Sequence, residues 1–265
     1  EVSFCFSSEC CFENACSCAA DTESVCKTDL KSIARSVLFN SYKTGFKARR
    51  SKRSDVSKLF KVGTPLAVQM GMETASFSLA SLLMGWIGAV ELAAFQVMCT
   101  TGSLCFLVYY GIAAAACIRI SHYRGRSEWE KVNETATAGL HIIFAVAAIL
   151  STGIIIFKCQ LAAAFTSDIA IQNMFIAMLI PMLAYQVSDG IQINYANALR
   201  GIAVTKPMSI YAIISYILLA LPISYLLGFV FNWGGIGIAY GLPVGLTSAA
   251  ILYYTRFRKE IKKRV

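Results

Sequence analysis

Charged side chains are scarce in this chain of 265 residues. Asp, Glu, Lys and Arg together make up 15% of it, and the hydrophobic residue types make up 57%. A soluble globular domain usually carries about a quarter charged residues. The chain also has only five prolines, and its mean hydropathy is +0.60. This composition excludes an ordinary soluble domain and indicates that a lipid bilayer surrounds most of the chain.

Motifs of enzyme chemistry are missing as well. The sequence contains no phosphate-binding loop, no paired metal ligands and no nucleophile with an evident base. We therefore expect no enzyme activity, no catalytic residue, no cofactor and no bound metal other than Na⁺. The net charge of +9 is explained by attraction to anionic lipid headgroups, so no nucleic-acid partner is expected.

The few charged residues are concentrated near the ends of the chain. Residues 1–60 hold 17 of the 39 charged residues, and the last ten residues hold seven more. The long apolar stretches between them reach the length of roughly 20 residues that a membrane helix needs. We predict six spanning helices, at about 60–86, 89–117, 134–157, 169–199, 207–230 and 234–256.

Basic residues alternate between the connections of these six helices. Lys and Arg are frequent before the first helix, between the second and third, between the fourth and fifth, and after the sixth, whereas the other connections contain only Lys158. Basic residues near span ends face the cytoplasm. The sequence therefore predicts an all-α, six-transmembrane-helix bundle, multi-pass in the plasma (inner) membrane, with both the N- and C-termini cytoplasmic.

The first 40 residues have a different composition from the rest. They contain six of the ten cysteines and neither glycine nor proline. They lack the Cys-x-x-Cys pairs of structural zinc sites, and a disulfide framework would need an oxidising compartment. We interpret 1–40 as a Cys-rich, unstructured leader. The following parts are interpreted as a basic cytoplasmic linker (41–57), a six-helix transmembrane lobe (58–257) and a basic cytoplasmic tail (258–265).

Two acids, Glu73 and Asp189, interrupt the apolar spans. Ionisable side chains inside a membrane are costly and usually face the interior of a bundle or a hydrated cavity. Glu73 follows Lys61 by 12 residues and Asp189 precedes Arg200 by 11, which places them about 18 Å and about 16 Å from the same membrane surface. Because the two carboxyl groups lie at nearly one level, we expect them to share a cation or a proton.

Polar residues accompany the two acids. Gln69 lies four residues before Glu73, and Tyr185 lies four before Asp189, so each shares a helix face with its acid. Further candidates for a hydrated substrate path are Gln96, Thr100, Gln192 and Asn194. The alternative is that these side chains only bind helices to one another. For the acids the alternative is pairing with a buried base, but no Lys or Arg is expected within the core of any span.

Several segments resemble the multidrug and toxic compound extrusion (MATE) family, and specifically its second six-helix lobe. They are LFKVGTPLAVQMGMETASFS in the first predicted helix, LAAFQV and IRISHYRG in and after the second, YQVSDGIQINYANALRG in the fourth and LPISYLLGF in the fifth. The resemblance implies transport activity. It also implies that Glu73, Asp189 and Tyr185 take part in binding Na⁺ or H⁺.

The resemblance covers one lobe, whereas members of that family have two six-helix lobes with the substrate bound between them. We expect either a truncated product or a lobe that pairs with a missing first lobe or with a second copy of itself. The predicted function is that of a cation-coupled (Na⁺ or H⁺) antiporter lobe in the lipid bilayer that exports small organic, drug-like compounds. The alternatives are a lipid-linked saccharide flippase of the same superfamily and a non-transporting membrane fragment.

Overall fold

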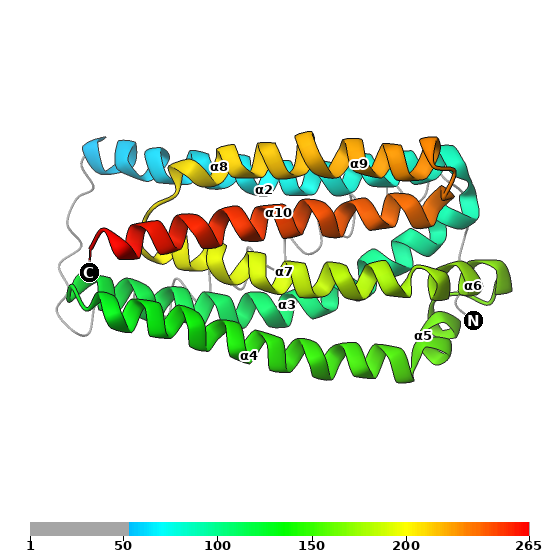
Figure 1. Ribbon diagram of the computed structural model, residues 1–265, viewed down its shortest axis with the longest axis horizontal. Helices are drawn as coiled ribbons and strands as arrows, with labels where there is room; N and C mark the ends of the chain where they lie inside the picture. Colours follow the sequence, from blue (N-terminus) through cyan, green and yellow to red (C-terminus); the bar gives the residue numbers. More distant parts are fainter. Residues whose placement is uncertain (1–52, 265) are drawn as a thin grey trace. The chain divides into compact units, whose positions relative to one another are not determined.

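The computed structural model describes residues 53–264, whose regular elements are all helices (Figure 1). Residues 57–265 form one compact unit. The predicted leader and residues 41–52 of the predicted linker lie outside the described residues, whereas residues 53–57 of that linker belong to the first described helix. The all-α prediction is confirmed for the part of the chain that the structure describes.

The helical elements follow one another with short connections. They are α2 (Arg53–Ile87), α3 (Ala89–Gly125), α4 (Trp129–Ile156), α5 (Lys158–Phe165), α6 (Ile169–Ala177), α7 (Leu179–Gly201), α8 (Lys206–Ala212), η1 (Ile213–Ala220), α9 (Leu221–Tyr225), η2 (Leu226–Val230) and α10 (Gly234–Lys262). The two η elements are π-helical. Together α8, η1, α9 and η2 make one stretch of 25 residues.

The fourth predicted helix is broken rather than continuous. α6 and α7 meet at Met178 and are bent by 50° relative to each other. Pro181 lies in the first turn of α7, where its missing N–H and its ring remove the hydrogen bond to the carbonyl one turn earlier. The proline therefore explains why α6 turns away from α7. A short helix that was not predicted, α5, precedes it.

Fewer than six helices meet the criteria of length and apolar composition for a membrane span. Among the described residues, α3, α4, the 206–230 stretch and α10 are long and apolar enough to cross a bilayer, and the bent pair of α6 and α7 counts as a fifth span if taken as one. α2 occupies the first predicted span but is not among them. Six spans with both ends in the cytoplasm therefore stay a prediction.

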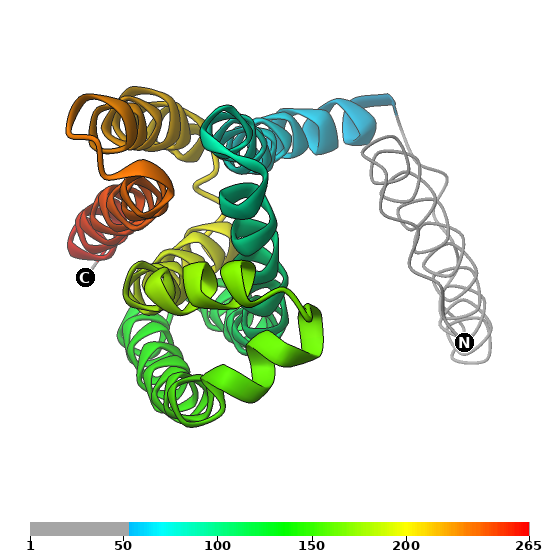
Figure 2. The same ribbon diagram turned by 90° about the vertical axis from the view of Figure 1, so that its right-hand side faces the viewer.

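α7 is the most enclosed helix of the described unit. It packs against α10 on one side and against α3 and α4 on the other (Figures 1 and 2). Within 188–199 every residue except Ile191 is buried. Because three helices surround it, polar side chains on α7 must find partners inside the bundle.

α10 and α9 approach each other at a glycine. A Cβ atom placed on Gly241 would clash with the backbone and side chain of Ser224. The Ser224 hydroxyl donates a hydrogen bond to the Ile238 carbonyl one turn before that glycine, at 3.3 Å. Small residues permit this kind of close helix contact in membranes.

We predict that Gly241→Ala lowers stability by about 1–3 kcal/mol, because the added methyl group forces the two helix backbones apart. Gly111→Ala is the matched control, since nothing lies within 4 Å of a Cβ at that helical position. The control should be neutral or stabilising by about 0.5–1 kcal/mol. Thermal unfolding in detergent, followed by helicity, measures both. Equal melting temperatures for the two variants would contradict the close contact.

Candidate functional site

Glu73 and Asp189 lie close together inside the bundle. Glu73 projects from α2 and is half-buried, whereas the Asp189 side chain on α7 is only 2% exposed. The two carboxyl groups are near enough for their charges to interact. The structure thus brings together the two acids that the sequence placed at one membrane depth.

Gln192 joins the acids to a third helical segment. Its side-chain amide donates a hydrogen bond from Nε2 to the Tyr216 hydroxyl on η1, at 3.0 Å. The same side chain lies within hydrogen-bonding reach of Glu73. Its Oε1 atom is buried and has no hydrogen-bond partner among the described residues. A buried amide oxygen without a hydrogen-bond partner is available as a ligand for a hard cation.

Tyr185 lies one turn before Asp189 on α7. Its ring meets the Phe77 ring of α2 edge to face, with the centroids 5.8 Å apart. On its other side the ring packs against Gly102 of α3, where an added Cβ would come within 3.1 Å of the Tyr185 ring. Tyr185 is close enough to both acids for electrostatic interaction. It therefore belongs to the same cluster, packed between α2 and α3.

Arg200 also reaches this cluster, which corrects the expectation that no basic side chain enters the core of a span. Its guanidinium donates to Gln69 Oε1 of α2 at 3.2 Å and to Asn197 Oδ1 at 3.4 Å. It also interacts electrostatically with Glu73. The physical reason is that helical side chains lean toward the helix N-terminus. Arg200 sits at the end of α7, so its side chain extends back into the bundle.

Three of the remaining predicted residues lie elsewhere. Gln96 and Thr100 are exposed on α3, where the Thr100 hydroxyl bonds the Gln96 carbonyl at 2.9 Å. Asn194 is buried against α4 and donates to the Ala136 carbonyl at 3.0 Å. Asn194 therefore connects two helices and does not join the acid cluster. Gln69, in contrast, joins it through Arg200.

Sequence reasoning missed two residues of this site, Arg200 and Tyr216. The signal for Arg200 was present, because 11 residues at 100° each bring it to within about 20° of Asp189 on α7. By its position at the end of the fourth predicted helix, however, Arg200 indicates a residue at the membrane surface. Tyr216 sits in an apolar stretch, ISYILLAL, that carries no such signal. Only the packing of η1 beside α7 places its hydroxyl near Gln192.

The ligand chemistry of this cluster is that of oxygen donors. It offers two carboxylates, an amide oxygen and phenol hydroxyls. No group of three or more His, Cys, Asp or Glu side chains able to hold a metal ion occurs in residues 53–264. Oxygen ligands of this kind suit protons and hard cations rather than transition metals.

Comparison with known proteins assigns the chain to a family. The MatE family model matches residues 65–226. A probable multidrug resistance protein NorM from Xylella fastidiosa strain 9a5c is 32% identical over 203 residues, which are 77% of this chain and 43% of that protein. The multidrug resistance protein NorM of Vibrio vulnificus strain YJ016 is also 32% identical, over 75% of this chain and 44% of its own length.

Solved structures of MATE transporters share the fold. The eukaryotic MATE transporter AtDTX14 has a TM-score of 0.81 at 19% identity, with 89% of this chain and 55% of that one covered. An outward-facing multidrug resistance MATE family transporter of the MOP superfamily has a TM-score of 0.77 at 18% identity, covering 89% and 55%. The chain spans about half the length of these proteins. With a family model that matches most of it and relatives above 30% identity, this chain belongs to the MatE family of membrane transporters.

Proposed function

We propose that the chain is one lobe of a cation-coupled antiporter that exports organic, drug-like compounds, with the coupling ion bound by Glu73 and Asp189. The observation that carries the proposal is that α2 and α7 meet on both sides of the two acids, through the Gln69–Arg200 hydrogen bond of 3.2 Å and the Phe77–Tyr185 ring contact with centroids 5.8 Å apart. Relatives named multidrug resistance protein NorM supply the substrate class. The coupling ion is Na⁺ or H⁺, and no enzymatic step is involved.

Arg200 limits how much positive charge the site can accept. Two ionised carboxylates and one guanidinium sum to a single negative charge. One Na⁺ or one proton then makes the cluster neutral. Leaving a charge uncompensated inside a membrane protein costs several kcal/mol. We therefore propose that the site binds one monovalent cation per transport cycle.

Cation binding would change the relative position of two helices. Glu73 is on α2, whereas Asp189 and Gln192 are on α7, so a cation shared between them draws the two helices together. Release of the cation leaves Arg200 and Gln69 as the polar connection between these helices. Transporters of this type move a lobe or its helices around a site near the middle of the membrane. The chain's single lobe would face a second lobe or a second copy of itself across the substrate cleft.

We expect Glu73→Gln and Asp189→Asn each to abolish dye efflux, because the neutral amides retain size but cannot exchange a cation. The test joins this chain to the first half of a NorM relative and measures efflux in cells that lack other exporters. Glu91→Gln, in the first turn of α3, is the matched control and should leave efflux unchanged. Efflux at the wild-type rate from both acid variants would contradict the proposal. A Na⁺ gradient and a pH gradient, imposed separately, identify the coupling ion.

Arg200→Gln should change the coupling ratio, which is the number of cations moved for each substrate molecule, rather than only slow transport. Without the guanidinium the cluster carries two negative charges, and about one additional cation is then needed to neutralise it. The measurement is the ion gradient that just balances an opposing dye gradient in proteoliposomes. Arg200→Lys should preserve the wild-type ratio, and the exposed Arg126→Gln serves as control. A ratio unaffected by Arg200→Gln would show that Arg200 has no part in ion binding.

The chain by itself should bind the coupling ion but transport substrate only if two copies assemble. Proteoliposomes that contain this chain alone, loaded with a cationic dye, test this under an imposed ion gradient. Ion-driven dye movement supports a functional pair of lobes. Ion binding without dye movement supports the need for a separate first lobe. Neither binding nor movement would favour the non-transporting fragment over the antiporter.

A further inference from the structure

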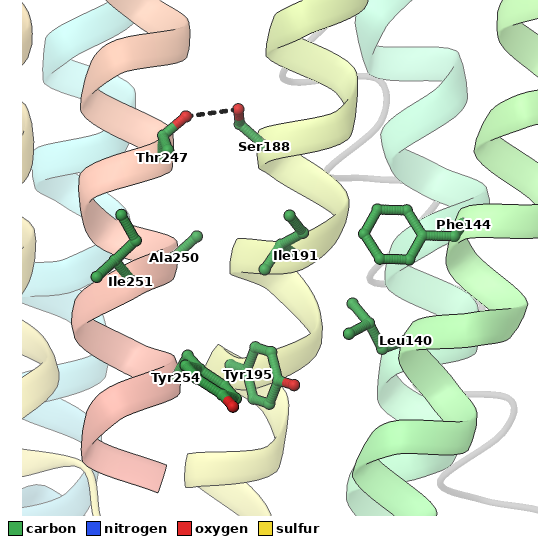
Figure 3. Close-up of a pocket in the computed structure, with 9 residues that line it drawn as sticks. All are labelled: Leu140, Phe144, Ser188, Ile191, Tyr195, Thr247, Ala250, Ile251 and Tyr254. Atoms are coloured by element: carbon green, nitrogen blue, oxygen red, sulfur yellow. Dashed lines mark hydrogen bonds between the residues drawn. The ribbon is translucent and has the colours of Figure 1, made fainter. Parts of the chain in front are cut away.

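A groove runs along α7 between α4 and α10, on a helix face about 100° or more away from that of Asp189 (Figure 3). It has a volume of about 310 Å³. α7 forms its floor, and α4 and α10 form its walls. The lining residues are Leu140, Phe144, Ser188, Ile191, Tyr195, Thr247, Ala250, Ile251 and Tyr254.

The groove changes in chemistry from one end to the other. At one end a hydrogen bond of 2.7 Å between the Ser188 and Thr247 hydroxyls joins α7 to α10 (Figure 3). The middle is aliphatic. At the other end the rings of Tyr195 and Tyr254 meet edge to face, with centroids 5.0 Å apart. Beyond them the Arg258 guanidinium lies 5.9 Å from the Tyr254 centroid.

The order of aliphatic residues, tyrosines and arginine along the groove matches the order of acyl chain, interface and headgroup in one lipid leaflet. Eleven residues of α10 separate Thr247 from Arg258, which is about 16 Å of helix. Half of a hydrocarbon core of roughly 30 Å is about the same length. Tyrosine is favoured at the level where acyl chains meet headgroups. An acyl chain along the aliphatic part would thus bring its headgroup to Arg258.

The charge at the mouth selects for an anionic occupant. Arg256 is held by Glu260 in an ion pair of 2.7 Å, whereas Arg258 turns over the Tyr254 ring at the groove. Lys259 and Lys262 follow on exposed positions of the same helix. A cationic drug would be repelled here. A zwitterionic lipid would bring a positive group to the same basic surface together with its phosphate, so a lipid with net negative charge fits better.

We propose that this groove binds one acyl chain of an anionic phospholipid, whose phosphate headgroup pairs with Arg258. The site is separate from the ion cluster, because Ser188, Ile191 and Tyr195 form one stripe of α7 while Asp189 and Gln192 lie on another. It does not depend on the transport proposal. It also does not depend on which membrane face carries the basic ends.

The test compares lipid retention by the full chain in nanodiscs, using spin-labelled phosphatidylglycerol and spin-labelled phosphatidylcholine. The wild type should hold phosphatidylglycerol about fivefold more tightly, the preference expected for one basic residue at the membrane surface. Arg258→Gln should reduce this preference to about onefold, and Arg258→Lys should preserve it. The exposed Arg124→Gln removes an equal charge at the end of α3 and should have no effect.

A second variant tests the groove itself. Ile251→Trp should fill the space between α4 and α10 and reduce the immobilised fraction of both lipids, and circular dichroism checks that each variant is folded. Three outcomes would overturn the proposal. They are equal retention of the two lipids by the wild type, an unchanged preference in Arg258→Gln, and displacement of the lipid by a cationic dye with no competition from phosphatidylglycerol.

Discussion

The structure depends on the compensation of charge inside an apolar bundle. Asp189 is buried on the most enclosed helix, and a carboxylate there is tolerated only if other groups neutralise or solvate it. The second acid, Glu73, adds to this cost, because like charges repel. The positive charge nearby comes from Arg200 of α7, whose guanidinium also donates a hydrogen bond to Gln69 of α2. Under the proposed function, the two carboxylates and the guanidinium leave one negative charge, which one bound monovalent cation would neutralise.

The two sides of α7 have different surroundings. One stripe carries Asp189 and Gln192 toward α2 and η1, where hydrogen bonds and charge dominate. The other carries Ser188, Ile191 and Tyr195 into a groove that is mostly aliphatic and aromatic. Because both stripes belong to one rigid helix, a lipid seated in the groove and a cation in the cluster would contact the same moving element. α7 is also set at an angle of 50° to α6, from which it is separated by the break at Met178.

Much of this arrangement was predictable from the sequence. Apolar runs located the helices, since their length is fixed by the thickness of the bilayer. The common depth of Glu73 and Asp189 followed from helix rise alone. The bend before Pro181 was not predicted, because a proline in a span can either kink a helix or be accommodated without a break. Asn194 shows the same limit, because its residue type gave no indication that its side chain would bond α4. The assignment of Gln96 and Thr100 to a substrate path stays a prediction.

The sequence by itself determined that the chain is a helical membrane protein with two acids at one level, because composition and helix rise are local properties. Only the tertiary structure decided which polar groups meet. Arg200 extends back into the bundle, Tyr216 reaches Gln192 from η1, and Asn194 turns to α4. Such contacts depend on the rotation and spacing of helices far apart in the chain, and those are set by packing of whole surfaces rather than by any single segment.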